Sequence, residues 1–350
     1  MTVFRRRCRD LVAAVGLVCL AGDQAASAAD DVTRSRYNAL FGALPVDMAT
    51  AERPMTPDKV ALGRLLFFDA RLSKSQTISC NSCHQLDNHG VDGEATSLGH
   101  KGQRGDRNSP TVMNAGLHVA QFWDGRAADL EEQAKGPILN PVEMAMPSEG
   151  VVVETLKSIP GYPPLFAAAF PDDDDPVTYD NMAVAMGAFE RGLVTPSNFD
   201  RYLAGDDAAL SPAARSGLEK FVSFGCASCH NGVGFGGRLY RVLGQFHPYA
   251  TEDPGRFAVT GEEADRKVFK VPSLRNVTET GPWFHDGSIE ELDEAIRLMG
   301  WHQLGLEIAP GDRAQIAVFL ESLEGTPVPE YIAMPALPPS GPNTPGPSPE

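Results

Sequence analysis

The sequence predicts a mainly α-helical protein of two domains, with long loops and little β-strand. Apolar residues recur at helical spacing after helix-start signals in several segments, whereas the alternation typical of strands is rare. The chain also carries 34 glycines and 28 prolines, which separate these segments by loops. Its 350 residues suffice for two hydrophobic cores, so each half is expected to fold around its own.

The N-terminus has the features of a secretory signal. Four arginines between positions 5 and 9 precede an apolar stretch at 11–21, and residues 26–28 supply the small side chains of a cleavage site. The apolar stretch is too short to span a bilayer. We therefore expect residues 1–29 to be a signal peptide cleaved near Ala28, and the mature protein to be periplasmic without a membrane span.

Two helices are expected just before two cysteine-rich motifs. One begins at Thr56-Pro57 and the other at Ser211-Pro212, because a hydroxyl side chain followed by proline is a common helix start. Their apolar faces are formed by Val60, Leu62, Leu65 and Leu66 in the first helix, and by Leu218, Phe221 and Val222 in the second.

Later signals complete the expected organisation. Ser288 and Glu291 predict a capping box for a helix that ends at Gly300, and residues 312–323 have the spacing of a last helix. Residues 30–195 are expected to form an N-terminal domain and residues 196–325 a C-terminal domain, with a linker near 196–211. The segment 326–350 is rich in Pro, Gly and Ser, so we expect a disordered tail.

The strongest functional signal is the pattern C-x-x-C-H, which occurs at residues 80–84 and 226–230. Two thiols about one helical turn apart can form thioethers to the vinyl groups of one haem, and the next residue supplies an imidazole to the iron. Two separated C-x-x-C pairs also fit a four-thiolate zinc site, but here a histidine follows each pair. The sequence therefore predicts two covalently bound c-type haems. The attachment cysteines are Cys80, Cys83, Cys226 and Cys229, and the proximal ligands are His84 and His230.

The charge of the chain limits the class of partner. The formal net charge is −16, which argues against nucleic acid and suits a basic partner such as a small cytochrome. Acidity also keeps an exported protein soluble, so charge alone does not choose between these readings. After signal cleavage every cysteine belongs to a haem motif, which leaves none for a structural disulfide.

Several segments outside these motifs resemble the bacterial di-haem cytochrome c peroxidases. They are spread in the family's order over nearly all of residues 35–325. The matching stretches are LGRLLFFDARLSKSQTISCNSC (62–83), SLGH (97–100), RNSPTV (107–112), QFWDGR (121–126), residues 133–144, GRFAVT (255–260), FKVPSLRN (269–276) and residues 299–305.

The resemblance implies a division of labour between the two haems. His100 matches the histidine that caps the N-terminal, peroxidatic haem opposite His84 and leaves on activation, and it lies in a glycine-rich loop. Met299 matches the methionine that ligates the C-terminal haem opposite His230, and such ligation raises a haem's reduction potential. Without the resemblance, His100 would be interpreted as a surface histidine and Met299 as core filling.

Other expected site residues also rest on the resemblance. Glu143 matches the family's distal acid, Gln133 its distal amide and Trp123 the tryptophan between the haems; from the residues alone, a surface glutamate and a packing tryptophan are the alternatives. The positions that hold a calcium ion at the domain interface correspond to Asn108, Thr280 and Pro282.

The resemblance implies a periplasmic peroxidase that reduces hydrogen peroxide to water with electrons from a small cytochrome c or a cupredoxin. It also leads us to expect a homodimer. Two alternatives stay open. One is a related di-haem oxidase that matures a quinone cofactor and carries tyrosine where Met299 stands, and the other is a di-haem electron carrier without enzymatic activity.

Overall fold

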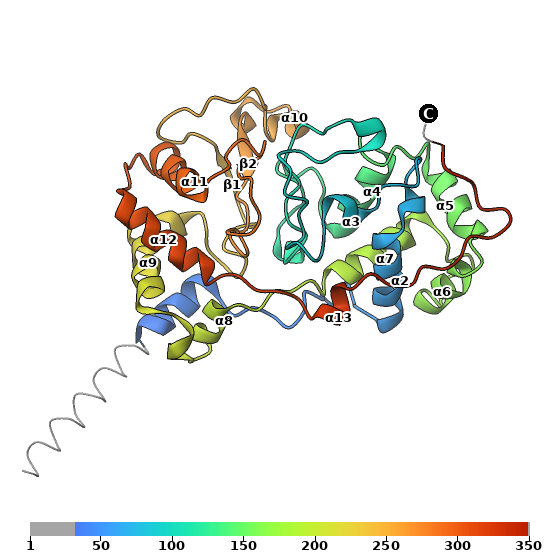
Figure 1. Ribbon diagram of the computed structural model, residues 1–350, viewed down its shortest axis with the longest axis horizontal. Coiled ribbons are helices and arrows are strands. Elements are labelled where there is room, and N and C mark those ends of the chain that lie inside the picture. The colour runs from blue at the N-terminus through green and yellow to red at the C-terminus, as the bar shows by residue number, and fades with distance from the viewer. Residues whose placement is uncertain (1–31, 349–350) are drawn as a thin grey trace, which may run out of the picture.

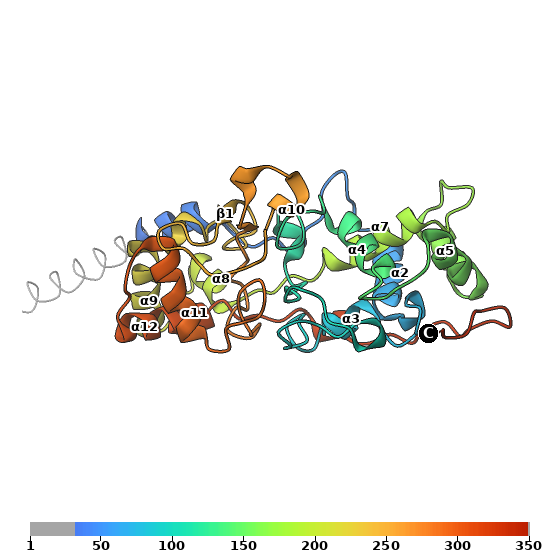
Figure 2. The same cartoon turned by 90° about the horizontal axis from the view of Figure 1, so that it is seen from above.

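The computed structural model describes residues 32–348, and the predicted signal peptide, residues 1–29, lies outside the described residues. The chain forms two helical lobes that lie side by side (Figures 1 and 2). Long loops from both lobes face each other between the helices. The mainly α-helical prediction is confirmed, because the described part contains only two strands of three residues each.

The first lobe contains most of the N-terminal half. Its helices are α2 (Pro57–Phe68), α3 (Cys80–Cys83), α4 (Leu130–Leu139), α5 (Glu149–Ser158), α6 (Tyr162–Ala169) and α7 (Tyr179–Glu190), with short 3-10 helices at Ala70–Leu72, His100–Gly102 and Ala115–Leu117.

The second lobe contains most of the C-terminal half. Its helices are α8 (Asn198–Leu203), α9 (Pro212–Ser223), α10 (Phe257–Thr260), α11 (Leu292–Met299) and α12 (Pro310–Glu321), with 3-10 helices at Asp207–Ala209, Cys226–Ser228 and Glu263–Asp265 and a π-helical turn at Gly300–Leu304. The strands β1 (Tyr240–Val242) and β2 (Val268–Lys270) form one antiparallel pair. The helix α13 (Pro329–Ile332) follows the second lobe in sequence.

The predicted helix starts are confirmed in two of three cases. The Thr56 hydroxyl accepts a hydrogen bond from the Lys59 amide at 3.3 Å, and Ser211 does the same for Ala214 at 3.1 Å. The capping box at Ser288 is wrong. Residues 283–289 close a turn through a bridge between their ends, so Ser288 belongs to this turn and α11 begins only at Leu292.

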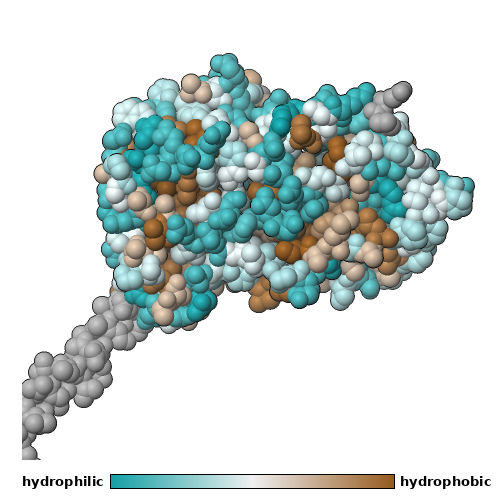
Figure 3. Space-filling view, in the orientation of Figure 1, coloured by the Kyte–Doolittle hydropathy of each residue, from teal (hydrophilic) through white to brown (hydrophobic). Residues whose placement is uncertain are grey.

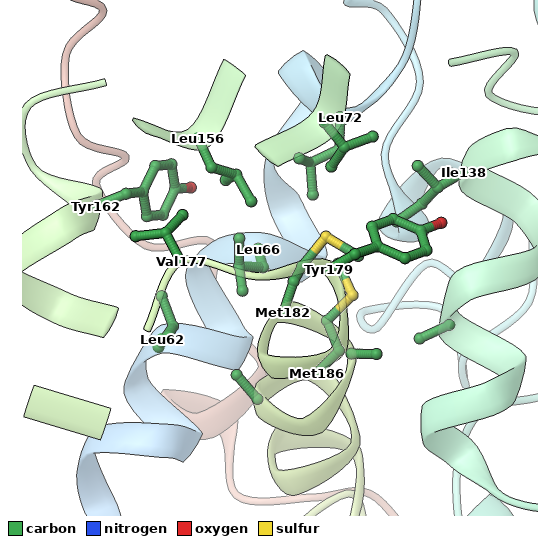
Figure 4. Packing of buried hydrophobic residues seen from close by; sticks show 14 of the residues in the cluster. Leu62, Leu66, Leu72, Ile138, Leu156, Tyr162, Val177, Tyr179, Met182 and Met186 are labelled. Atoms are coloured by element: carbon green, nitrogen blue, oxygen red, sulfur yellow. The ribbon is translucent and has the colours of Figure 1, made fainter. Parts of the chain in front are cut away.

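The core of the first lobe is built on the packing of α2 against α7. Leu62 and Leu66 of α2 meet Met182 and Met186 of α7, and all four side chains are fully buried (Figure 4). Gly63 allows this close approach, because a Cβ there would lie 1.9 Å from the Ala185 carbonyl oxygen. The pair fixes the frame from which α3 and its cysteines extend.

The core of the second lobe is built in the same way, on the packing of α9 against α12. Gly217 lies at their crossing, where a Cβ would come within 1.9 Å of the Gln315 carbonyl oxygen. Leu218, Phe221 and Phe319 are buried on either side. In each lobe, therefore, two helices pack closely at a glycine, and the first helix of the pair lies shortly before a C-x-x-C-H motif in the sequence.

A turn is also repeated in the two lobes. Residues 121–127 and 283–289 are each closed by an isolated antiparallel bridge between their end residues. Phe122 and Phe284 occupy the same place in the two turns, with φ of 66° and 71°. A helix follows each turn, α4 in the first lobe and α11 in the second.

Two segments lie differently from the predicted division into domains and linker. The helix at 32–41, predicted within the N-terminal domain, places Phe41 in the second core, where its ring lies 4.1 Å from that of Phe235. The segment 196–211, predicted as a linker, contributes the buried Phe199 of α8 to the same core. Its apolar residues explain the difference, because they fill space between α9, α12 and the N-terminal helix.

The tail is ordered from residue 326 to residue 348, contrary to the prediction of disorder. Tyr331 of α13 stacks on Phe189 of α7 with ring centroids 5.1 Å apart, and its hydroxyl donates to the Phe189 carbonyl at 2.6 Å. Farther along, the Ser348 amide donates to the Lys74 carbonyl at 2.9 Å. Composition predicted disorder, but these contacts with the first lobe hold the segment in place along its edge (Figure 1).

The surface is mainly hydrophilic on the face seen in Figure 3, with smaller hydrophobic areas on both lobes. Between residues 32 and 348, none of the helices has the length and apolar character needed to cross a membrane.

Candidate functional site

The first C-x-x-C-H motif lies on the wall of a cavity of about 1100 Å³ in the first lobe. Cys80 and Cys83 are the ends of α3, and both line the cavity together with His84. The imidazole Nδ1 of His84 lies 3.4 Å from the Gly90 carbonyl oxygen. Since a carbonyl only accepts, this contact places the proton on Nδ1 and leaves Nε2 as a ligand. Burial lowers the pKa of His84, which keeps the ring neutral.

The second motif has the same local geometry around a smaller cavity of about 240 Å³. Cys226, Cys229 and His230 line this cavity, and Nδ1 of His230 lies 3.2 Å from the Phe235 carbonyl oxygen. Burial lowers the pKa of His230 to about 4. Each cavity thus offers two thiols and one neutral imidazole, which is the donor set of haem c. The cysteine pairs line different cavities, so they do not form the alternative four-thiolate zinc site.

The first cavity is the more polar of the two. Gln133 of α4 and Glu143 both line it and are half-buried. The Glu143 carboxylate oxygen Oε1 accepts a hydrogen bond from Asn140 Nδ2 at 2.9 Å. Burial raises the pKa of Glu143, although Arg126 and the Asn140 hydrogen bond oppose the shift. The chain folds back after α4, and this reversal brings Glu143 to the cavity rather than to open solvent.

The structure places His100 next to Glu143 through the backbone. The His100 amide donates to the Val142 and Glu143 carbonyl oxygens at 2.9 and 2.8 Å. The side chain is buried, and its Nδ1 has no hydrogen-bond partner among the described residues. His100 is not one of the residues that line the first cavity. Its role as a ligand therefore stays a prediction.

Met299, at the end of α11, lines the second cavity together with His230. Otherwise this cavity is mainly apolar, with residues of α9, α11 and α12 on its walls. The structure therefore brings together the two residues that were expected to ligate one iron. The ligation itself stays a prediction.

Trp123 lines both cavities, which makes it part of a shared wall. Its indole Nε1 donates to the Asn108 carbonyl at 2.9 Å, and its own carbonyl accepts from the Lys270 amide at 2.7 Å. His285 also lines both cavities, and its carbonyl accepts from the Asn108 amide at 2.8 Å. Four residues from the two lobes are thus tied together by backbone and indole hydrogen bonds.

The three residues expected at a calcium ion, Asn108, Thr280 and Pro282, all line the second cavity. The Asn108 side-chain amide donates to the carbonyl oxygens of Glu94 and Ala95 at 3.0 and 3.3 Å. Within the described residues no cluster of three or more His, Cys, Asp or Glu side chains suits a metal ion. Calcium there would rest on carbonyl and amide oxygens, and it stays a prediction.

Among the buried charged residues that sequence reasoning missed in these cavities are Glu190 and Lys270. Glu190, in the last turn of α7, lines the first cavity, and burial raises its pKa to about 8. It follows Ala183 and Met186 at helical spacing, so the periodicity of α7 was the available signal. Lys270 lines the second cavity and is 5% exposed. Its sequence neighbours gave no comparable signal.

Comparisons with known proteins show the family of the chain. A family model described as "Di-haem cytochrome c peroxidase" matches residues 57–208. The cytochrome c551 peroxidase of Pseudomonas aeruginosa is 47% identical over 314 residues, which cover 87% of this chain and 90% of that protein. A cytochrome c551 peroxidase of Nitrosomonas europaea is 47% identical over 304 residues, covering 86% and 90%. The chain belongs to the di-haem cytochrome c peroxidase family.

A solved structure supports this assignment. The crystal structure of a MauG-like protein associated with microbial copper homeostasis superposes with a TM-score of 0.73 at 28% identity, covering 83% of this chain and 95% of that one. As a di-haem cytochrome c peroxidase, the chain takes two haem cofactors.

Proposed function

We propose that this chain reduces hydrogen peroxide to two waters in the periplasm with electrons from a small soluble cytochrome c or cupredoxin. The observation that carries the proposal is the asymmetry of the two haem cavities. One is lined by a carboxyl and an amide, the other by a methionine and a histidine, and Trp123 belongs to the wall of both. A protein that only carried electrons would need no acid in either cavity.

When bound, the haems supply the electrons and an iron at which peroxide binds. The residues of the first cavity supply the rest of the chemistry. Peroxide reduction consumes two electrons and two protons, and cleavage of the O–O bond requires a proton to move from one oxygen to the other. Glu143 makes this transfer. Asn140 fixes Oε1 and leaves Oε2 to exchange the proton, while Gln133 orients the substrate.

Residues of the second cavity set up electron storage. Met299 and His230 would hold the iron of the second haem, and such a pair of ligands would raise its potential and favour the reduced state. Trp123 and its hydrogen bonds to Asn108 and Lys270 keep the wall between the two cavities in one arrangement. This wall is the path that an electron takes between the sites.

Further parts of the proposal rest on the family resemblance. His100 caps the first site until the second is reduced, Asn108, Thr280 and Pro282 hold calcium, and two chains form a homodimer. Residues 30–195 contribute most of the peroxidatic domain, although the helix at 32–41 packs on the other lobe. Residues 196–325 contribute most of the electron-transfer domain.

The test is peroxide-dependent oxidation of a reduced small cytochrome by the haem-loaded protein. We expect saturable turnover that is lost in the matched variant Glu143→Gln. Reduction of the protein without peroxide turnover would support the electron carrier instead. Peroxide-dependent oxidation of a quinone precursor in a partner protein, without cytochrome turnover, would support the maturation oxidase.

A further inference from the structure

Lys270 is a buried cation without an acidic partner. The residue is 5% exposed, and its ammonium Nζ lies 3.2 Å from Nδ1 of His118. Of the carboxylates in residues 32–348, none forms an ion pair with it. The imidazole Nε2 of His118 is also buried without a hydrogen-bond partner among the described residues. Burying a charge is costly unless a counter-charge is present, so the arrangement is incomplete as it stands.

The cavity beside Lys270 has an unusual charge for so acidic a chain. No aspartate or glutamate is among the described residues that line the second cavity, although the chain carries 46 acidic residues. Both Lys270 and Arg241 line it, Lys270 in the interior and Arg241 on the exposed side of β1. The first cavity is different, because Asp124, Glu143 and other acids line it. The second cavity is therefore suited to a group that carries its own negative charge.

The position of Lys270 indicates which part of that group it meets. Cys226 packs against the core of the second lobe, whereas the Lys270 amide is bonded to Trp123 of the first lobe. Cys226 thus belongs to the wall that adjoins the core of the second lobe, and Lys270 to the wall that adjoins the first lobe. In haem the vinyl groups that form thioethers lie on one edge of the ring, and the two carboxylate side chains lie on the opposite edge.

We propose that Lys270, held by His118, is the counter-ion of a haem carboxylate at the edge of the second haem that faces the first lobe. The proposal concerns this chain's charge at the second site and does not depend on which substrate the first site reduces. Lys270 acts as a positioning residue for the carboxylate, and it neutralises a negative charge close to the iron. Loss of that neutralisation favours the oxidised iron, because an unpaired carboxylate stabilises the additional positive charge.

The test is the midpoint potential of the second haem, measured by spectroelectrochemical titration of the haem-loaded protein. In Lys270→Met we expect the ratio of reduced to oxidised second haem at a fixed potential to fall about tenfold, which is ~59 mV for a one-electron couple. Lys270→Arg keeps the charge and is expected to retain the wild-type value. Lys267→Met, three residues earlier and outside the cavity, serves as the matched control.

A lowered potential in Lys270→Met, with wild-type values in Lys270→Arg and Lys267→Met, supports the proposal. An unchanged second-haem potential in Lys270→Met overturns it. Haem content is measured first, and if Lys270→Met fails to hold its second haem, Lys270→Gln takes its place with the same two outcomes. Since cytochrome turnover is not the readout, failure here is distinct from failure of the proposed peroxidase activity.

Discussion

At the scale of single residues, Glu143 combines a buried carboxyl with one fixed hydrogen bond. If it moves the peroxide proton, Glu143→Gln should keep both haems and their potentials but lower peroxide turnover by roughly two to four orders of magnitude. Glu132→Gln, an exposed neighbour on α4, is the control and should turn over normally. Steady-state turnover near the wild-type rate in Glu143→Gln would remove Glu143 from the mechanism.

The same carboxyl predicts a pH dependence. Glu143 must be ionised to accept a proton, and burial raises its pKa above the ordinary glutamate value. Turnover of the wild type should therefore fall as the pH drops through that raised pKa, at a higher pH than an ordinary carboxyl would give. This acid limb belongs to Glu143 and should be absent from the residual activity of Glu143→Gln.

The proposed role of Met299 as an iron ligand rests on its position beside His230 in the wall of the second cavity. Met299→His should lower the potential of the second haem, because imidazole favours the oxidised iron more than a thioether does. The oxidised protein should also lose its sulfur-to-iron absorption near the red end of the visible spectrum. Both are measured on the purified protein, and an unchanged spectrum and potential would return Met299 to core packing.

At the scale of elements, the loop around His100 is held against the segment that carries Glu143. Gly99 fits there because a Cβ would lie 2.0 Å from the Val142 carbonyl oxygen. If His100 blocks the first site in the oxidised protein, His100→Gly should react with peroxide without prior reduction, whereas the wild type should react slowly. His89→Gly is the control, since His89 has φ of 52° and accepts glycine without strain. Stopped-flow mixing of the oxidised proteins that gave equal slow rates would exclude His100 as the gate.

The tail is the other element with a testable role. Tyr331 covers the outer side of α7. Its ring stacks on Phe189, and its hydroxyl donates a hydrogen bond to the Phe189 carbonyl. Tyr331→Ala should destabilise the protein by about 1–3 kcal/mol, seen as a lower midpoint of thermal unfolding. Tyr331→Phe keeps the stacking and should lose only about 1 kcal/mol. Met334→Ala, at a side chain that is 69% exposed, should leave the midpoint unchanged; equal midpoints for all three would show that the tail does not brace the lobe.

At the scale of the whole molecule, local signals predicted what local chemistry controls. The helix starts at Thr56 and Ser211 were predictable because their caps lie within three residues, and the C-x-x-C-H motifs because their spacing is set by the cofactor. The tail was not, since its order comes from Phe189 and Lys74, far away in sequence. Lys270 was missed because its contacts with Trp123 and His118 form only when the lobes meet, whereas Glu190 is buried at the end of α7 within the first lobe.

The two lobes exchange covering elements in a related way. After α7 the chain leaves the first lobe, and Phe199 packs on Phe319 of α12 with ring centroids 5.7 Å apart. After α12 the chain leaves the second lobe, and Tyr331 packs on Phe189 of α7. The segment that follows α7 thus covers α12, and the segment that follows α12 covers α7. This exchange holds the two cavities in a fixed relation across their shared wall.

That wall gives the last prediction, because Trp123 lines both cavities and is hydrogen-bonded to residues of each lobe. Trp123→Phe should keep both haems and their potentials but slow the transfer of an electron from the second site to the first. The measurement is stopped-flow mixing of half-reduced protein with peroxide, monitoring oxidation of the second haem. Trp283→Phe is the matched control: its indole also donates to a carbonyl, that of Val277 at 2.8 Å, but it lines only the second cavity. If both variants transfer electrons at the wild-type rate, the path does not require the indole.

If both variants are slowed equally, the loss comes from disturbed packing and not from a path through Trp123. A path through the shared wall requires that Trp123→Phe be slow and that Trp283→Phe transfer electrons at the wild-type rate.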